Sequence, residues 1–360
     1  ACRADLTDTM DARLEFYKAI APPDWLAGGM LCTYFKAASV QKSNIQNPPP
    51  DFPYRYALPT TTTARCLQQW DTVFHSLGLQ HNNSELALDV IRALISRQLP
   101  NGYIPPVSVS GEDQTMAQNI HPPLLAWTVT HLSERTMKLE FLNQTYPGIV
   151  RYIEWIDAHR QQHNGLYGWC LEQTEQTARG AESMMCESPR FDHVSQMTAV
   201  DLSSYMASEF FALEKIARCL DKTEESRNWQ QRRMHLADLI NKHLWDDEER
   251  FYYDLDEYGE FVRVKTTAGF TPLLGLVPDR DRAEALRVHL MNSNRFWSPV
   301  PVCSVSQDEA TYGREAWRGC MWCSFNVLIY YGLLAYGFLP EARRLARATM
   351  TEVMRGYLEN

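Results

Sequence analysis

Residues 182–192 read Glu-Ser-Met-Met-Cys-Glu-Ser-Pro-Arg-Phe-Asp, and the rest of the chain is best understood by working outward from them. This stretch is polar and turn-forming at its centre, and it lies between two segments with helical periodicity. We therefore expect a long functional loop on a helical scaffold. The charges of Glu182, Glu187 and Asp192 are equally compatible with an ordinary solvated surface loop, so composition alone leaves both interpretations open.

Length and charge exclude several classes of protein. The chain has 360 residues, 45% of them hydrophobic, with a formal net charge of −9. That is enough to bury a large core. No long run of basic residues offers a face to nucleic acid or to an anionic membrane, so we expect neither as a partner. The 10 tryptophans and 17 tyrosines mildly favour a site that handles sugars.

Signals for targeting and redox state are weak. No run approaches the roughly 18 apolar residues of a membrane span, and the N-terminal residues contain no apolar signal region. We therefore expect a cytoplasmic protein, or a secreted one if a leader has been removed. Nine cysteines without small-scaffold spacing indicate mostly reduced, buried thiols. Glycosylation sequons at Asn82 and Asn143 point weakly toward secretion.

Helical periodicity dominates the chain. Within residues 84–97, for example, apolar side chains recur at intervals of three and four and form one stripe. Pro147 and Pro340 suit first-turn positions, and Asp201 suits an N-cap. The pattern predicts helices at residues 9–20, 24–38, 84–97, 123–139, 147–160, 200–220, 224–244, 280–291, 321–337 and 340–358.

Strand signals are few, and the clearest is a hairpin of residues 250–254 with residues 260–264 across a turn at Gly259. Many helices without a linker suit an all-α closed toroid of paired inner and outer helices, an (α/α)6 toroid, with this small β-hairpin as a decoration. We expect a single domain over residues 1–360. The long polar loops should gather at one end, where a site can form. These loops are residues 99–122, 161–199 and 292–317.

Four motifs occur in order along nearly the whole chain. They are Trp70-Asp71-Thr72-Val73-Phe74, Gln98 to Pro105 with His121-Pro122-Pro123, the stretch at 182–192, and Trp317-Arg318-Gly319-Cys320-Met321-Trp322 with Asn326. Together they resemble the motifs of the glycoside hydrolase family 63 clan, the (α/α)6 relatives of trehalase and of the bacterial mannosylglycerate and glucosylglycerate hydrolases. The resemblance implies an exo-acting, inverting hydrolase of a small α-glucoside or α-mannoside, with no metal or cofactor.

Inverting hydrolysis needs a carboxylic acid and a carboxylate about 6.5–9.5 Å apart, with the attacking water beside the carboxylate. By resemblance, the base is a Glu at the end of the helix that follows the Trp-Arg-Gly motif, which corresponds to Glu359. The alternative for Glu359 is a frayed terminal charge. The family pattern continues with one more loop and helix, which are missing from a sequence that stops at Asn360. We expect them to be truncated or supplied in another way.

The acid position departs from the family. Alignment on Ser-Pro-Arg-Phe-Asp puts Cys186 where the family has its acid Asp, and Glu187 where it has Asn. A thiol with a pKa of about 8.5 is a poorer general acid than a carboxylic acid tuned to about 6. The acid is then Cys186 itself, Glu187 after a shift of register, or Glu182 from the other side.

Two further interpretations of Cys186 stay open. With Cys320 and Cys323 it could act as a thiolate nucleophile or a zinc ligand, since such chemistry is known on the (α/α)6 scaffold of the β-L-arabinofuranosidases. The chain could also be a degenerate enzyme that binds a sugar or a partner without turnover. Substrate contacts should differ from those of the family, because further departures cluster here. They are Ala181, Met184, Ala316, Cys320 and His121.

The resemblance also implies substrate contacts. Asp71 would hydrogen-bond sugar hydroxyls, Trp70 and Trp322 would form apolar walls, and Arg318 with Asn326 would orient the ring or support the loops. Simple core packing is the alternative for the two tryptophans. The remaining implied contacts are Phe74, Gln98, His121, Trp317 and Gly319.

Two expectations complete the analysis. Arg190 and Asp192 should form a structural ion pair that fixes the loop. The expected ligand is a small carbohydrate or glycoside. The sequence gives no information on oligomeric state.

Overall fold

Helices make up most of the chain in a computed structural model that describes residues 6–61, 65–111, 118–136, 138–172 and 178–359. The α-helices are α1 (Leu6–Lys18), α2 (Gly28–Asn44), α3 (Gln69–Leu79), α4 (Ser84–Ile95), α5 (Leu125–Thr136), α6 (Leu139–Arg160), α7 (Val200–Cys219), α8 (Thr223–His243), α9 (Arg280–Met291), α10 (Cys323–Ala335) and α11 (Leu339–Glu359). Short 3-10 helices are η1 (Ala181–Ser183), η2 (Pro189–Phe191), η3 (Thr267–Leu273) and η4 (Ala316–Arg318). The predicted all-α class is confirmed.

Helices whose ends are capped by side chains begin where the sequence predicts. The Asn83 side chain accepts the backbone N–H of Leu86 at 3.0 Å and starts α4, and Asp279 does the same for Arg282 at 2.8 Å and starts α9. Such caps satisfy N–H groups that have no partner inside the helix.

The roles predicted for Pro147 and Asp201 at helix starts are wrong, although α7 begins at the predicted residue 200. Pro147 is not in a first turn, because α6 begins eight residues earlier at Leu139 and runs through the proline. Burial of Phe141 and Tyr146 offsets the hydrogen bond that a proline removes. Asp201 is not an N-cap. It lies inside the first turn of α7, where its carboxylate is buried and paired with an arginine.

The described strands are two residues long and form antiparallel pairs. The pairs are β1 (Ile45–Gln46) with β2 (Tyr56–Ala57), β3 (Leu67–Gln68) with β4 (Val107–Ser108), β5 (Trp245–Asp246) with β6 (Phe251–Tyr252), and β7 (Asp254–Leu255) with β8 (Phe261–Val262). The predicted hairpin is confirmed only for β7 and β8, which are joined by a turn with Gly259 at φ 82°. Residues 251–252 pair instead with β5, and β7 is the strand that pairs with β8.

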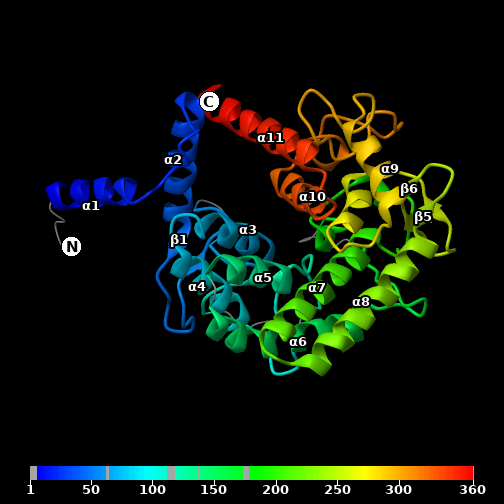
Figure 1. Ribbon diagram of the computed structural model, residues 1–360, viewed down its shortest axis with the longest axis horizontal. Coiled ribbons are helices and arrows are strands. Elements are labelled where there is room, and N and C mark those ends of the chain that lie inside the picture. The colour runs from blue at the N-terminus through cyan, green and yellow to red at the C-terminus, as the bar shows by residue number, and fades with distance from the viewer. Residues whose placement is uncertain (1–5, 62–64, 112–117, 137, 173–177, 360) are drawn as a thin grey trace.

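The helices follow one another around a ring (Figure 1). Its inner layer consists of α3, α5, α7, η3 and α10, each in contact with the next. The remaining helices from α2 to α11 lie outside this layer, and α11 returns to contact α2 (Figure 1). This is the predicted toroid. Helix α1 lies apart from the ring.

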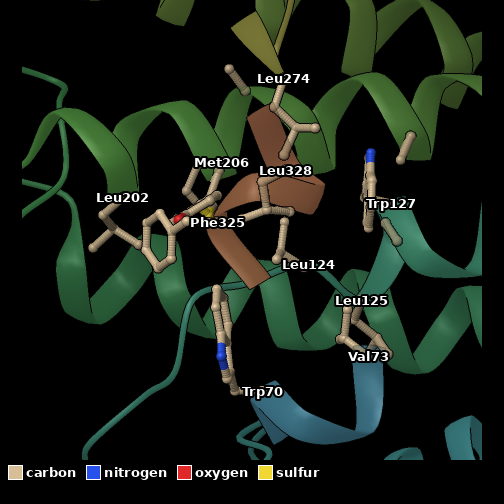
Figure 2. Close-up of a cluster of buried hydrophobic side chains, with 14 of the residues drawn as sticks. Trp70, Val73, Leu124, Leu125, Trp127, Leu202, Met206, Leu274, Phe325 and Leu328 are labelled. Atoms are coloured by element: carbon tan, nitrogen blue, oxygen red, sulfur yellow. The ribbon is translucent and has the colours of Figure 1, made fainter. Parts of the chain in front are cut away.

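Side chains fill the interior of the ring. Figure 2 shows Trp70 and Val73 of α3, Trp127 of α5, Met206 of α7 and Phe325 of α10 in one apolar cluster. Helix α7 has 16 of its 20 residues buried, most of them with apolar side chains. The hydrophobic effect therefore holds the inner layer together.

No helix among the described residues is long and apolar enough to cross a membrane.

Candidate active site

A buried carboxylate, Glu182, connects the loop before α7 to the rest of the protein. Glu182 accepts the backbone N–H groups of Ile120 at 3.0 Å and Cys170 at 2.8 Å, and it pairs with Arg160 at 2.6 Å. The Glu182 carboxylate therefore joins three segments of the chain. Glu182 has a structural position and is not presented to a ligand.

The expected pair of Arg190 with Asp192 is wrong. The Arg190 guanidinium is completely buried and donates to Asp201 at 2.5 Å and to both oxygens of Asp254 at 3.2 Å. Burial disfavours the charged form of Arg190, but the two carboxylates outweigh it and raise the pKa above the usual value. A charge in the protein interior requires such partners, and the sequence-adjacent Asp192 points the other way.

Asp192 joins the loop to the Trp-Arg-Gly motif. Its two carboxylate oxygens accept from the two terminal nitrogens of Arg318 at 2.6 and 3.0 Å. This bidentate geometry fixes both position and orientation. The hydrogen bond to Asp192 raises the pKa of Arg318, so the guanidinium keeps its charge. Loops 161–199 and 292–317 are thereby brought together, although residues 112–117 and 173–177 of the predicted loops lie outside the described residues.

Cys186 and Glu187 are less buried than the residues that hold the loop. Cys186 is half-buried. Burial raises the pKa of its thiol, and the Glu187 carboxylate raises it further, so the thiol keeps its proton at neutral pH. Glu187 is exposed and accepts the backbone N–H of Arg179 at 3.0 Å. Met184 has φ 59° at the position where the family motif has Gly, which explains the glycine of that motif.

The three cysteines considered as a zinc site do not form one. Among the described residues, which include Cys186, Cys320 and Cys323, no three His, Cys, Asp or Glu side chains are arranged to hold a metal ion. Burial also raises the pKa of Cys323. A protonated thiol is a poorer nucleophile than a thiolate, so burial of Cys186 and Cys323 weighs against the nucleophile interpretation.

A chain of aromatic rings runs from η4 to α3. Trp322 stacks on Trp317 with centroids 4.0 Å apart, Trp317 meets Phe325 at 5.1 Å, Phe325 meets Trp70 at 5.8 Å, and Trp70 meets Phe74 at 4.9 Å. Trp70 and Trp317 are buried, so they pack the core. Trp322 is 36% exposed and is the member that a ligand can reach most easily.

Gly319 supports this aromatic chain through its backbone. Its φ is 157°, and a Cβ there would lie 2.0 Å from the carbonyl oxygen of Gly313. Only glycine permits this close approach between the two segments of the loop. Gly319 therefore shapes the turn that carries Trp317 and Trp322.

A hollow of about 540 Å³ lies between α2, α3 and α11. Asp71 and Phe74, both predicted substrate contacts, line it together with His75 and Tyr357. Burial raises the pKa of the Asp71 carboxyl and lowers that of the His75 imidazole. The sequence analysis missed His75, although its position one helical turn after Asp71 is a usable signal. It also missed Tyr357, which no motif marks.

Three predicted substrate contacts hold the protein's own backbone or lie buried. Gln98 donates to the carbonyls of Gly102 and Gly148 at 2.8 and 2.7 Å. Asn326 donates to the Pro301 carbonyl at 3.0 Å and fastens that loop to α10. His121 is buried, and burial lowers its pKa to about 4, so it is neutral.

Glu359, the predicted base, lies on the last turn of α11 and is exposed. Leu358 of this turn contacts the start of α2 at Gly29. Val353 and Tyr357, on the preceding turns, line the hollow. Glu359 is not among the residues that line the hollow, and it lies on the surface.

Residues 66–359 match the family model of the mannosylglycerate hydrolase MGH1-like glycoside hydrolase domain. The chain belongs to this family. The probable mannosyl-oligosaccharide glucosidase of Schizosaccharomyces pombe is 25% identical to this MGH1-like chain over 357 residues, covering 81% of the chain and 44% of that protein. The mannosylglycerate hydrolase of Rubrobacter radiotolerans is 34% identical over 143 residues, covering 38% of the chain and 31% of that protein. The match spans less than half the length of each relative.

The solved structure of the GH63 mannosylglycerate hydrolase from Thermus thermophilus, in complex with Tris, is similar to the MGH1-like chain. The TM-score is 0.76 at 20% identity, with 90% of this chain and 92% of the other covered. At this identity the likeness concerns the fold, and it agrees with the ring of paired helices described above.

Proposed function

We propose that this MGH1-like chain is an exo-acting glycoside hydrolase that cleaves a small α-glucoside or α-mannoside with inversion. Family membership supports glycosidase chemistry, and the two relatives described above are named as a mannosyl-oligosaccharide glucosidase and a mannosylglycerate hydrolase. The observation that carries the proposal is the Asp192–Arg318 bridge. It holds the loop of Cys186 and Glu187 against the motif that presents the exposed Trp322 ring.

Each proposed role follows from the chemistry of its group. Glu359 is the base that activates water, because a carboxylate is needed there and it is exposed to solvent. Glu187 is the preferred acid, since it is the exposed carboxyl next to the family's acid position. The protonated Cys186 thiol is the second choice, because it gives up a proton to an alkoxide less readily. Asp71 binds sugar hydroxyls, and Trp322 stacks on the sugar ring.

The test is hydrolysis of a panel of α- and β-glycosides by the wild type and three variants. We expect Glu187→Gln and Glu359→Gln to reduce turnover by at least about 100-fold, as loss of a general acid or base does. Cys186→Asp, which restores the family residue, should raise it. Unchanged turnover in both Glu variants would refute the assigned roles.

A second function, sugar binding without hydrolysis, is supported by the replacement of the family's acid by Cys186. Its signature is an inert wild type that still binds monosaccharides, measured by tryptophan fluorescence and calorimetry. Trp322→Ala should then weaken binding by about 1–2 kcal/mol. Trp25→Ala is the matched control, because Trp25 is 65% exposed and lies outside the aromatic chain.

A further inference from the structure

The turn that carries Cys186, residues 184–187, has a backbone conformation that its residues disfavour. Met184 has φ 59° and ψ 16°, and Glu187 has φ 57°, so both lie in the left-handed region. Gly adopts this conformation without cost, and Asn adopts it more readily than most other residues. The motif that the stretch resembles has Gly at position 184 and Asn at position 187. This chain has replaced both by residues that are strained there, and residues 184–187 are therefore called the strained turn.

A strained backbone persists only where the surrounding contacts fix it. On the side before Cys186, the backbone N–H of Met184 donates to the Ala181 carbonyl at 3.0 Å. Met185 is completely buried, and its N–H donates to the Ser183 hydroxyl at 3.0 Å. These contacts fix the first half of the strained turn. The second half needs a support of its own.

Arg179 and Glu187 are joined by two hydrogen bonds. The N–H of Glu187 donates to the Arg179 carbonyl oxygen, and the N–H of Arg179 donates to Oε1 of the Glu187 carboxylate, both at 3.0 Å. The second bond requires an acceptor on the side chain of residue 187, which the carboxylate supplies. The Glu187 side chain therefore offsets part of the strain that its own backbone introduces.

The Arg179 guanidinium fixes the loop that follows the strained turn. Its Nε donates to the Phe191 carbonyl at 2.8 Å, and its two terminal nitrogens donate to the carbonyls of Leu171, at 3.4 Å, and Val194. Phe191 and Val194 lie on either side of Asp192 in the sequence, and Asp192 forms the bridge to the Trp-Arg-Gly motif. Arg179 thus connects the strained turn to this bridge.

We propose that Arg179 is a positioning residue of the candidate active site, which holds the strained turn in the conformation that places Cys186 and Glu187 near the Trp-Arg-Gly motif. The Glu187 carboxylate lies close enough to Arg318 to contribute to the raised pKa of that guanidinium. Oε1 of Glu187 accepts the Arg179 N–H, so Oε2 is the oxygen that can carry a proton to a leaving group. The inference rests on the proposed function, in which position 186 or 187 supplies the acid.

Alkylation of Cys186 tests the positioning role without requiring turnover. The thiol is half-buried, so release of the strained turn should expose it to iodoacetamide, with the modified peptide followed by mass spectrometry at one pH. We expect Arg179→Met to raise the rate about tenfold over wild type. Cys219, at the end of α7, is exposed and is the internal control whose rate should not change. Arg151→Met, which removes an exposed arginine of α6, is the matched control for charge.

Variants of Glu187 separate its position from its charge. Glu187→Gln and Glu187→Ala remove the same charge, but the Gln amide oxygen can still accept the Arg179 N–H. Glu187→Ala should therefore be alkylated at Cys186 about tenfold faster than Glu187→Gln. Glu187 is exposed, so neither change should alter the circular dichroism of the folded protein.

Met184→Gly tests the contribution of strain. Glycine adopts φ 59° without cost, so the strained turn should then depend less on Arg179. In the Arg179→Met background, Met184→Gly should return the alkylation rate of Cys186 toward the wild-type value. A rate that stays as high as in Arg179→Met alone would contradict the role of strain.

Turnover gives a second readout. On a glycoside that the wild type hydrolyses, Arg179→Met should lower kcat by about tenfold or more and change KM much less, because the proton donor is displaced while the sugar contacts remain. Equal alkylation of Cys186 in wild type, Arg179→Met and Glu187→Ala overturns the proposal, even if Glu187 proves to be the acid. Equal rates in Glu187→Gln and Glu187→Ala also overturn it. A wild type without turnover refutes the proposed hydrolysis, and the alkylation rates then decide the positioning role alone.

Discussion

The loop between α6 and α7 and the hollow between α2 and α11 belong to the same ring but are built by different means. The loop is fixed by buried charges, with Glu182 on two backbone N–H groups and Arg190 between Asp201 and Asp254. The hollow is lined by apolar side chains that are left partly in water. A charge network admits one geometry, whereas apolar walls accept any complementary surface. The first suits a site that must be precise, and the second leaves apolar side chains open to solvent.

The largest effect should come from breaking the charge network. Arg190→Met leaves Asp201 and Asp254 buried without a cation, so we expect a loss of about 3–5 kcal/mol in the free energy of unfolding, measured in urea at pH 7. Arg355→Met removes an exposed pair with Glu352 and should leave the unfolding midpoint nearly unchanged. If both changes lowered the free energy of unfolding equally, the buried charges would stabilise the protein no more than an exposed ion pair does.

The free energy of unfolding should also depend on pH, because of a buried carboxylate in α7. Glu209 is buried in α7 and accepts the N–H groups of Ala126 and Trp127 at the start of α5, both at 2.8 Å. Burial raises its pKa from 4.5 to about 7. Between these values the unfolded chain is ionised and the folded chain is protonated, so stability falls as pH rises, by about 3 kcal/mol in all.

Urea unfolding between pH 4 and 8 measures this slope. The matched variant is Glu209→Gln, which cannot ionise. The difference in unfolding free energy between wild type and variant should therefore shift in favour of the variant as pH rises through 7. A constant difference would show that Glu209 is not the titrating group.

A smaller effect is expected from a change at Asn326, which joins α10 to the loop at residues 301–302. Asn326 donates to the Pro301 carbonyl and the Thr349 hydroxyl and accepts the N–H of Val302. Asn326→Ala leaves buried backbone groups unpaired, so we expect a loss of about 2–3 kcal/mol by thermal or urea unfolding. The exposed Asn294→Ala is the control. A loss no larger than that of the control would contradict the fastening role.

The smallest effect should come from the hollow itself. Val353→Ala on α11 should change the unfolding free energy by less than about 0.5 kcal/mol in dilute protein, because Val353 is 43% exposed. On the same helix, Leu345 is completely buried, and Leu345→Ala should cost about 2–5 kcal/mol. A large cost at Val353 would mean that the wall of the hollow is already packed.

Much of the ring could be predicted because its helices carry their own signals. α4 and α9 have side-chain caps and apolar faces, so their starts match the sequence pattern. The start of α6 could not be read from Pro147, because the helix begins before it and buries Phe141 and Tyr146. Tertiary burial overrides the local rule there.

The candidate site was predictable only as a stretch of sequence. Motifs pointed to Cys186, Glu187 and the Trp-Arg-Gly segment, but they could not show that Arg190 pairs with Asp254, 64 residues away. The hollow beside Asp71 was marked only on its α3 side, by Asp71 and Phe74 of the first motif. It arises from what α2 and α11 leave uncovered, and no local pattern records that.

The Asp192–Arg318 bridge also orders events in time. Its partners are 126 residues apart in the sequence. At a synthesis rate of about 5–20 residues per second, the loop emerges roughly 6–25 s before the arginine that clamps it. During that interval Cys186 and Glu187 lack the Arg318 clamp, and the candidate site is assembled only when one of the last elements of the ring is made. A nascent chain therefore lacks this bridge until Arg318 has been made.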